Sequence, residues 1–350
     1  MHQTRTDVHG PAAQRRSRAR GDAAAYGWLS ALQLGSQLLL WVAFFAYDRA
    51  LQAAWQAAVL LIVPLLALYA LWRWGGPALQ TRAGRLVCLA LLPCLVLDAA
   101  FLLFALSGLI GELIPHYPPW VGVGVPAVVC ALTALCAKHR GTAYGAYTLR
   151  WLLVLLFVVG TLFLRASSRS DRLWPLLGRG VAQTALTALS GAGGLWGVAL
   201  LFARSPAGGQ GRLRYALGPW AAACVFALWF GLLRPWGRGD VLSLSQKLLG
   251  LSRSASGMVI YELAGLLWML LLPLSLTGTC CAGEALVLGA FPKCPRWIPA
   301  ALIPLPGALL LLCLSGSAAD VLGAALPYRA AVSLLCGAAL CLIARKENRP

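Results

Sequence analysis

Long, unbroken apolar runs are the feature that most constrains how this chain can fold. Stretches such as LLVLLFVVGTLFL (152–164) and AGLLWMLLLPLSL (264–276) carry no charge. Apolar runs of about 18 residues or more span membranes, where the backbone must satisfy its own hydrogen bonds as a helix or a closed barrel. These runs do not alternate polar and apolar residues as barrel strands do. The sequence therefore predicts an all-α polytopic membrane protein.

Composition supports the same interpretation. Apolar residues make up 60% of the 350 and charged residues 11%, against about 25% charged residues in soluble domains. The net charge of +18 would suggest nucleic acid in a soluble protein. Here the basic residues lie mostly in tails and loops, where they orient spans and contact anionic lipid. We expect membrane lipid as a partner and no nucleic acid.

The boundaries of the apolar runs, marked by charge, Pro and Gly, predict about ten transmembrane helices. We expect a disordered basic cytoplasmic tail at 1–24, a transmembrane domain at 25–346, and within it an interfacial helix at 241–254. The predicted spans are 25–47, 54–74, 85–110, 119–137, 145–164, 178–203, 215–234, 256–280, 297–316 and 326–344.

The distribution of positive charge predicts the orientation. Most of the 29 Lys and Arg residues fall in segments that are cytoplasmic if the N-terminus is inside, which places both termini in the cytoplasm. Arg329 is counted on the outer side in this arrangement. Several Trp residues, including Trp120, Trp151, Trp220 and Trp297, lie near span ends, where indole favours the membrane interface.

Two interruptions lie five spans apart. Span one contains Gly35-Ser36, and span six contains Ser190-Gly191-Ala192-Gly193-Gly194. Inverted five-helix repeats place broken first and sixth helices at the bilayer midplane, where freed backbone groups bind a ligand. This pattern predicts a five-plus-five inverted repeat, with Gly35, Ser36, Ser190, Gly191, Gly193 and Gly194 as ligand-binding residues. The alternative is that the small residues only allow helices to approach closely.

Two carboxylates fall inside predicted spans, Asp98 near the centre of span three and Glu262 in the first third of span eight. A lone charge at the bilayer centre costs about 2.5–3.5 kcal/mol, so it usually faces a cavity or a partner. Both are candidates for contacting a substrate ammonium, a cation or a proton. The alternative is a protonated or hydrogen-bonded carboxyl that packs helices.

The usual signatures of enzymes are missing. There is no HExxH, no P-loop and no GxSxG with partners, and the four His residues lie in tails or loops. Most Cys residues fall inside apolar runs, and Cys280, Cys281 and Cys294 lie near a predicted cytoplasmic loop that has no His to complete a zinc site. We therefore expect no catalytic residues, no metal site and no cofactor.

Several segments resemble the spore germination permeases, which are the B subunits of nutrient germinant receptors within the amino acid–polyamine–organocation superfamily. HYPPWVGVGVPAVVCALTALCAKHRG (116–141) and YTLRWLLVLLFVVGTLFL (147–164) are similar to the fourth and fifth spans of that family. SRSDRLWPLLGRGVAQTAL (168–186) resembles its short outer loop, and SLSQKLLGLSRSASGMVIYELAGLLWMLL (243–271) its outer helix leading into span eight.

This resemblance implies a leucine-transporter-like fold with a pocket among spans one, three, six and eight for a small germinant, often an amino acid. It also implies a receptor A subunit and a lipoprotein C subunit as partners, in the inner membrane of the spore. Two other functions stay open. One is a secondary active amino-acid transporter of the same superfamily, and the other is a viral or structural multi-span protein without a ligand.

Overall fold

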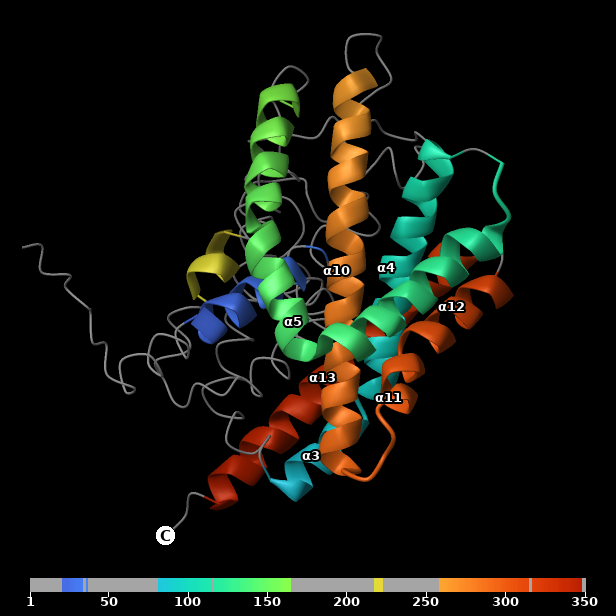
Figure 1. Cartoon of the computed structure of the whole chain (residues 1–350). Helices are drawn as coiled ribbons and strands as arrows, with labels where there is room; N and C mark the ends of the chain where they lie inside the picture. The colour runs from blue at the N-terminus through green and yellow to red at the C-terminus, as the bar shows by residue number, and fades with distance from the viewer. Residues whose placement is uncertain are drawn as a thin grey trace, which may run out of the picture.

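The computed structural model describes residues 21–33, 36, 81–114, 116–164, 217–222, 258–314 and 317–347, and nearly all of them are helical. The helices pack as a bundle around one long central helix (Figure 1). Predicted spans two and six, together with the predicted interfacial helix at 241–254, lie outside the described residues.

Predicted span three consists of two helices, α3 (Arg82–Leu89) and α4 (Leu92–Leu113). The Thr81 side chain accepts a hydrogen bond of 3.0 Å from the backbone N–H of Gly84 and so caps α3. Pro93 stands in the first turn of α4. Because proline has no N–H and its ring crowds the preceding turn, the helix is interrupted just before it.

Predicted spans four and five are joined in α5 (Pro119–Leu164) without the expected loop. The chain bends at Lys138, whose backbone angles are φ 55° and ψ 175°, and helical geometry continues directly afterwards. The bend of α5 is visible in Figure 1. The expected helical segments are present, but the loop at 138–144 was wrong, because one apolar helical stretch, Trp120–Leu152, continues across the bend. The polar residues that suggested a loop find protein partners, as described below.

The central helix, α10 (Met258–Ala290), extends well past the predicted end of span eight at residue 280. Cys280 and Cys281 are therefore buried inside a helix, and so is Glu284 at 8% exposure. Their predicted place near a cytoplasmic loop was wrong. The apolar run covers only part of α10. The helix continues beyond it because packing against other helices buries the less apolar residues after 280, such as Glu284.

The last two predicted spans correspond to α11 (Trp297–Leu302), α12 (Pro304–Cys313) and α13 (Ala318–Glu347). The helix breaks at Ile303, directly before Pro304, for the same reason as at Pro93. Because α13 begins before the predicted start at 326, Arg329 lies well inside a helix and is 2% exposed. Arg329 is thus a buried residue of a helix, and its assignment to the outer side of the membrane stays a prediction.

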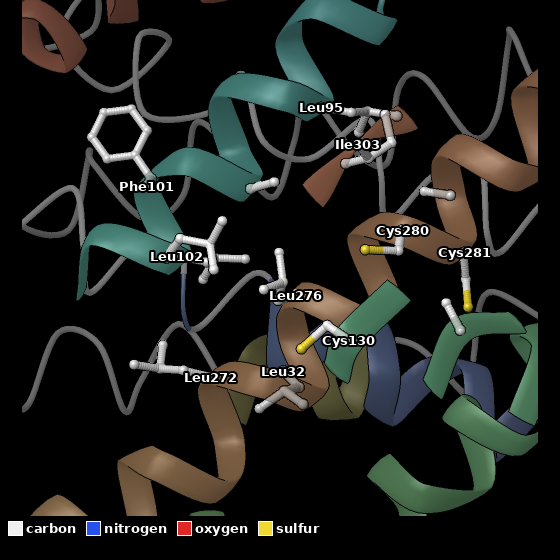
Figure 2. Close-up of a cluster of buried hydrophobic side chains, with 14 of the residues drawn as sticks. Leu32, Leu95, Phe101, Leu102, Cys130, Leu272, Leu276, Cys280, Cys281 and Ile303 are labelled. Atoms are coloured by element: carbon white, nitrogen blue, oxygen red, sulfur yellow. The ribbon is translucent and has the colours of Figure 1, made fainter. Parts of the chain in front are cut away.

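The core forms where α10 contacts α3, α4, α5 and α11, with α12 lying on α4 and α5. A Cβ atom on Gly307 of α12 would lie 3.1 Å from the backbone nitrogen of Ala100 in α4, so these helices meet almost backbone to backbone. Figure 2 shows part of the core, where Leu32, Cys130 and Leu276 come from three different helices.

Three helical stretches among the described residues are long and apolar enough to cross a bilayer: Leu92–Gly111, Trp120–Leu152 and Leu266–Ala290. Large apolar side chains such as Val129 and Leu132 are half exposed on α5, as expected of a surface that faces lipid. The protein is an integral membrane protein. Trp120, Trp151 and Trp297 are exposed, as residues of an interface belt would be, but Trp220 is fully buried and does not belong to it.

Candidate functional site

The strongest candidate site lies where the helix at 21–33 meets α10. Gln33, 3% exposed, points its amide nitrogen at two groups of α10. Its Nε2 donates to the backbone carbonyl of Ser275 and to the hydroxyl of Thr279, both at a long 3.5 Å. The Thr279 hydroxyl itself donates to the Ser275 carbonyl at 3.2 Å. We call Gln33, Ser275 and Thr279 the polar cluster.

Two atoms of the polar cluster have no hydrogen-bond partner in the described structure, Oε1 of Gln33 and Oγ of Ser275. Both residues are at least 97% buried. A buried polar group without a partner costs about 1–3 kcal/mol, so such groups mark a place where a ligand, an ion or water completes the structure. The cluster offers amide, hydroxyl and carbonyl oxygens and no charged group, which suits a monovalent cation or the polar part of a solute.

Gly278, which lies between Ser275 and Thr279 in α10, allows the helical residues 21–33 to approach α10 closely. A Cβ atom there would lie 2.7 Å from Nε2 of Gln33 and 3.1 Å from a methyl carbon of Leu29. Any side chain at this position would force the side chains of Gln33 and Leu29, or the helical residues 21–33 themselves, to shift. Glycine therefore brings the Gln33 amide within reach of Ser275 and Thr279.

A third segment of the chain supports the same helix. Trp220, in the helical residues 217–222, is fully buried and its indole N–H donates to the hydroxyl of Ser30. That hydroxyl donates in turn to the carbonyl of Gly27 at 2.7 Å. Residues of predicted spans one, seven and eight thus meet near the polar cluster. The polar cluster and the Trp220 contact were not predicted from the sequence.

Asp98 is buried in α4 and forms an ion pair with the guanidinium of Arg329 in α13. The side chains are 3% and 1% exposed, respectively. The Arg329 guanidinium carbon also lies 5.8 Å from the centre of the Phe101 ring, and the Arg329 carbonyl accepts a 2.7 Å hydrogen bond from Ser333. The negative charge that made Asp98 a candidate ligand-binding residue is neutralised by the protein itself.

Arg329 is the residue that sequence reasoning missed at this position. A signal was present in principle, since Asp98 and Arg329 are opposite charges that both fall inside predicted spans, and such charges pair inside membranes. The two residues are 231 positions apart, and only the fold brings them together.

The other predicted site residues are described only in part. Ser36 is 2% exposed, and its hydroxyl donates to the carbonyl of Leu32 at 2.8 Å. Glu262 lies in the second turn of α10, and its side chain is outside the described residues. Outside them as well are Gly35, Ser190, Gly191, Gly193 and Gly194. Their ligand-binding role stays a prediction.

No group of three or more His, Cys, Asp or Glu residues that could hold a metal ion occurs in the part of the chain described here. Cys130, Cys280 and Cys281 are buried in the core. Cys281 lies 3.5 Å from the hydroxyl of Thr142, which contributes to the contact between α10 and α5. These thiols act as small core residues.

In its fold, the chain is similar to solved structures of transporters. The chain is similar to a variant of the Eremococcus coleocola manganese transporter, with a TM-score of 0.63 and 12% identity over 94% of this chain and 78% of that one. The same transporter in complex with an aromatic bis-isothiourea substituted compound gives a TM-score of 0.61 at 12% identity, over 95% and 81% of the two chains. The inward-facing conformation of Mhp1 gives 0.53 at 14% identity, over 90% and 74%.

No protein-family model matches the sequence, and no curated protein matches it either. The similarity to solved structures therefore establishes the fold. The expected leucine-transporter-like, all-α membrane fold is confirmed.

Proposed function

We propose that the protein is a secondary active transporter, in which the polar cluster of Gln33, Ser275 and Thr279 contacts the driving cation. The observation that carries this proposal is the pair of unpartnered oxygens, Oε1 of Gln33 and Oγ of Ser275, buried between two helices of a transporter-like fold. A neutral set of oxygens binds an alkali cation weakly enough to release it, as a transport cycle requires.

The transported solute is proposed to be a small amino acid, as the resemblance of the sequence implies. The Asp98–Arg329 ion pair removes one candidate contact for the solute's ammonium group. Backbone groups at the two predicted helix interruptions are then the proposed contacts for the solute. A second candidate cargo is a divalent metal. It is supported only by the similarity in fold to the manganese transporter.

The test is uptake by the purified full chain in proteoliposomes. A panel of labelled amino acids and Mn²⁺ is offered under an inward Na⁺ gradient, an inward proton gradient, or neither. Accumulation above equilibrium under one gradient supports the proposal and identifies the ion. The absence of gradient-driven accumulation for every solute of the panel would refute it.

A matched pair of variants tests the polar cluster. Both Thr279 and Thr133 donate their hydroxyl to the carbonyl four residues earlier, but Thr279 lies at the cluster and Thr133 is exposed on α5. Thr279→Val keeps shape and removes an oxygen, so the cation concentration for half-maximal uptake should rise about fivefold, since one hydrogen bond or ligand is worth about 1 kcal/mol. Thr133→Val should leave it unchanged. Equal effects of the two substitutions would remove the cluster from the mechanism.

The same purified protein distinguishes the germinant-receptor hypothesis from the transporter hypothesis. The resemblance of segments 116–141 and 243–271 favours it, and it would involve the A and C subunits as partners. A receptor subunit binds its germinant without concentrating it. Stabilisation of the purified protein by one amino acid, together with no gradient-driven accumulation of that amino acid, would favour the receptor over the transporter.

A further inference from the structure

The backbone of Lys138 adopts a conformation that is rare for any residue with a side chain. Its φ of 55° and ψ of 175° fall in a region occupied almost only by glycine. It stands between the two helical halves of α5, which are the predicted spans four and five. A strained residue of this kind persists only where the surrounding structure holds it.

The contacts that hold it come from the first helix. Asp22, in the helical residues 21–33, accepts two hydrogen bonds of 3.2 Å from Nε and Nη2 of Arg140. It accepts a third, of 2.7 Å, from the hydroxyl of Tyr144. Both donors follow the bend closely, at the start of the second half of α5. Asp22 therefore fixes the direction in which this half leaves Lys138.

Two further contacts stabilise the bend at Lys138. The rings of Tyr26 and His139 lie 6.1 Å apart, one turn further along the first helix. The Thr142 hydroxyl donates to the Lys138 carbonyl at 2.9 Å and lies 3.5 Å from the Cys281 thiol of α10. The bend is thus held between the first helix and α10.

The ion pair between Asp22 and Arg140 is accessible to water and can therefore open. Asp22 has a side chain that is 6% exposed, but that of Arg140 is 51% exposed, so water can replace the carboxylate at the guanidinium. Strain at Lys138 favours release, and the hydrogen bonds to Asp22 oppose it. The Asp98–Arg329 pair has no such access to water, since both of its side chains are almost fully buried.

We propose that Asp22 is a clamp that holds a strained hinge at Lys138 closed, and that opening of this clamp lets the two halves of α5 and the first helix move relative to each other. The hinge is a conformational device that goes beyond the proposed transport function. It requires no ligand, so it can be tested on the protein alone.

The test is hydrogen–deuterium exchange of the full chain in lipid nanodiscs, read from peptides covering 134–146. Asp22→Asn keeps the size of the side chain and removes its charge. Exchange in these peptides should become about tenfold faster, because charge-assisted hydrogen bonds hold the turn. Unchanged exchange in this region would overturn the clamp.

The strain is tested in the same background with two substitutions at one position. Adding Lys138→Gly to Asp22→Asn should return exchange to within about twofold of the unsubstituted protein, because glycine adopts this backbone conformation freely. Adding Lys138→Ala should not, since alanine keeps the strain. Equal rescue by glycine and alanine would refute a strained hinge.

A milder variant tests the clamp if the Asp22→Asn protein does not insert properly into the membrane. Tyr144→Phe removes only the 2.7 Å hydrogen bond and leaves the ion pair intact, so exchange should rise about threefold. Thr148→Val is the control, because the exposed Thr148 hydroxyl donates to the Tyr144 carbonyl and to no other described residue. No rise with Tyr144→Phe, or an equal rise with Thr148→Val, would contradict the clamp. Uptake rates would follow the hinge only if the transport proposal also holds, so the two proposals can fail separately.

Discussion

Removing Asp98 should expose how much the membrane domain depends on one buried ion pair. In Asp98→Val the Arg329 guanidinium loses the Asp98 carboxylate in a site where its side chain is 1% exposed. Breaking a buried ion pair by removing one partner destabilises by about 3–5 kcal/mol. The same magnitude follows from Coulomb's law, which gives about 4 kcal/mol for two charges 4 Å apart at an effective dielectric constant of 20.

The opposite single variant should cost less. In Arg329→Met the Asp98 carboxylate is left alone, but a carboxylate can bind a proton and become neutral, whereas a guanidinium keeps its charge. We expect a loss of about 1–3 kcal/mol from the unsatisfied carboxyl group. The two single variants are therefore predicted to be unequal, in an order that follows from their chemistry.

The double variant Asp98→Val/Arg329→Met removes both charges and replaces them with apolar side chains. Because such replacements are often neutral or stabilising, the loss should fall to within about 1 kcal/mol of the unsubstituted protein. The assay is unfolding in mixed detergent micelles, followed by the helical circular dichroism signal. Arg345→Met, at an exposed position in the last turn of the same helix, is the control and should change stability by less than about 0.5 kcal/mol. Losses that simply add in the double variant would refute the ion-pair reasoning.

Three further predictions concern the first helix and its contacts. Gly278→Ala should destabilise by about 1–3 kcal/mol in the same unfolding assay, because its methyl group overlaps Gln33, whereas Gly124→Ala meets open space and should not destabilise. Raising NaCl from 0.1 to 1 M should speed hydrogen exchange near the half-exposed Asp22–Arg140 pair and leave exchange around the sealed Asp98 pair unchanged, since salt screens only accessible charges. Trp220→Phe should lose about 1 kcal/mol, the value of its buried hydrogen bond to Ser30, and no loss would mean that the contact is energetically neutral.

Hydrophobic pattern predicted which segments are helical, but not where packing extends the helices. The apolar runs at 85–110 and 256–280 locate α4 and α10 because lipid demands apolar length. The same criterion ended span eight at residue 280, although α10 continues to Ala290 with Glu284 buried in the protein. Hydropathy measures affinity for lipid, and a helix packed among other helices also accommodates polar residues that have protein partners.

The site was predictable only in its location on span one. The predicted interruption at Gly35-Ser36 pointed to the part of the chain that also contains Gln33, and Ser36 is buried there. Gln33 itself carries no recognisable motif, and its partners Ser275 and Thr279 lie 242 and 246 residues away. A single sequence does not encode such long-range pairs in any local pattern, so these contacts emerge only from the three-dimensional structure.

The helix at 21–33 connects the clamp with the polar cluster. Asp22 and Gln33 both lie in the helical residues 21–33, about 17 Å apart along a helix with a rise of 1.5 Å per residue. A helix of this length moves as a rigid rod, so a tilt that breaks the hydrogen bonds of Asp22 also changes the distance from Gln33 to Ser275 and Thr279. The 3.5 Å contacts of Gln33 are already at the limit of a hydrogen bond, and a small displacement is enough to break them. The two proposals together therefore predict that opening of the clamp and release of the proposed cation are two consequences of one movement.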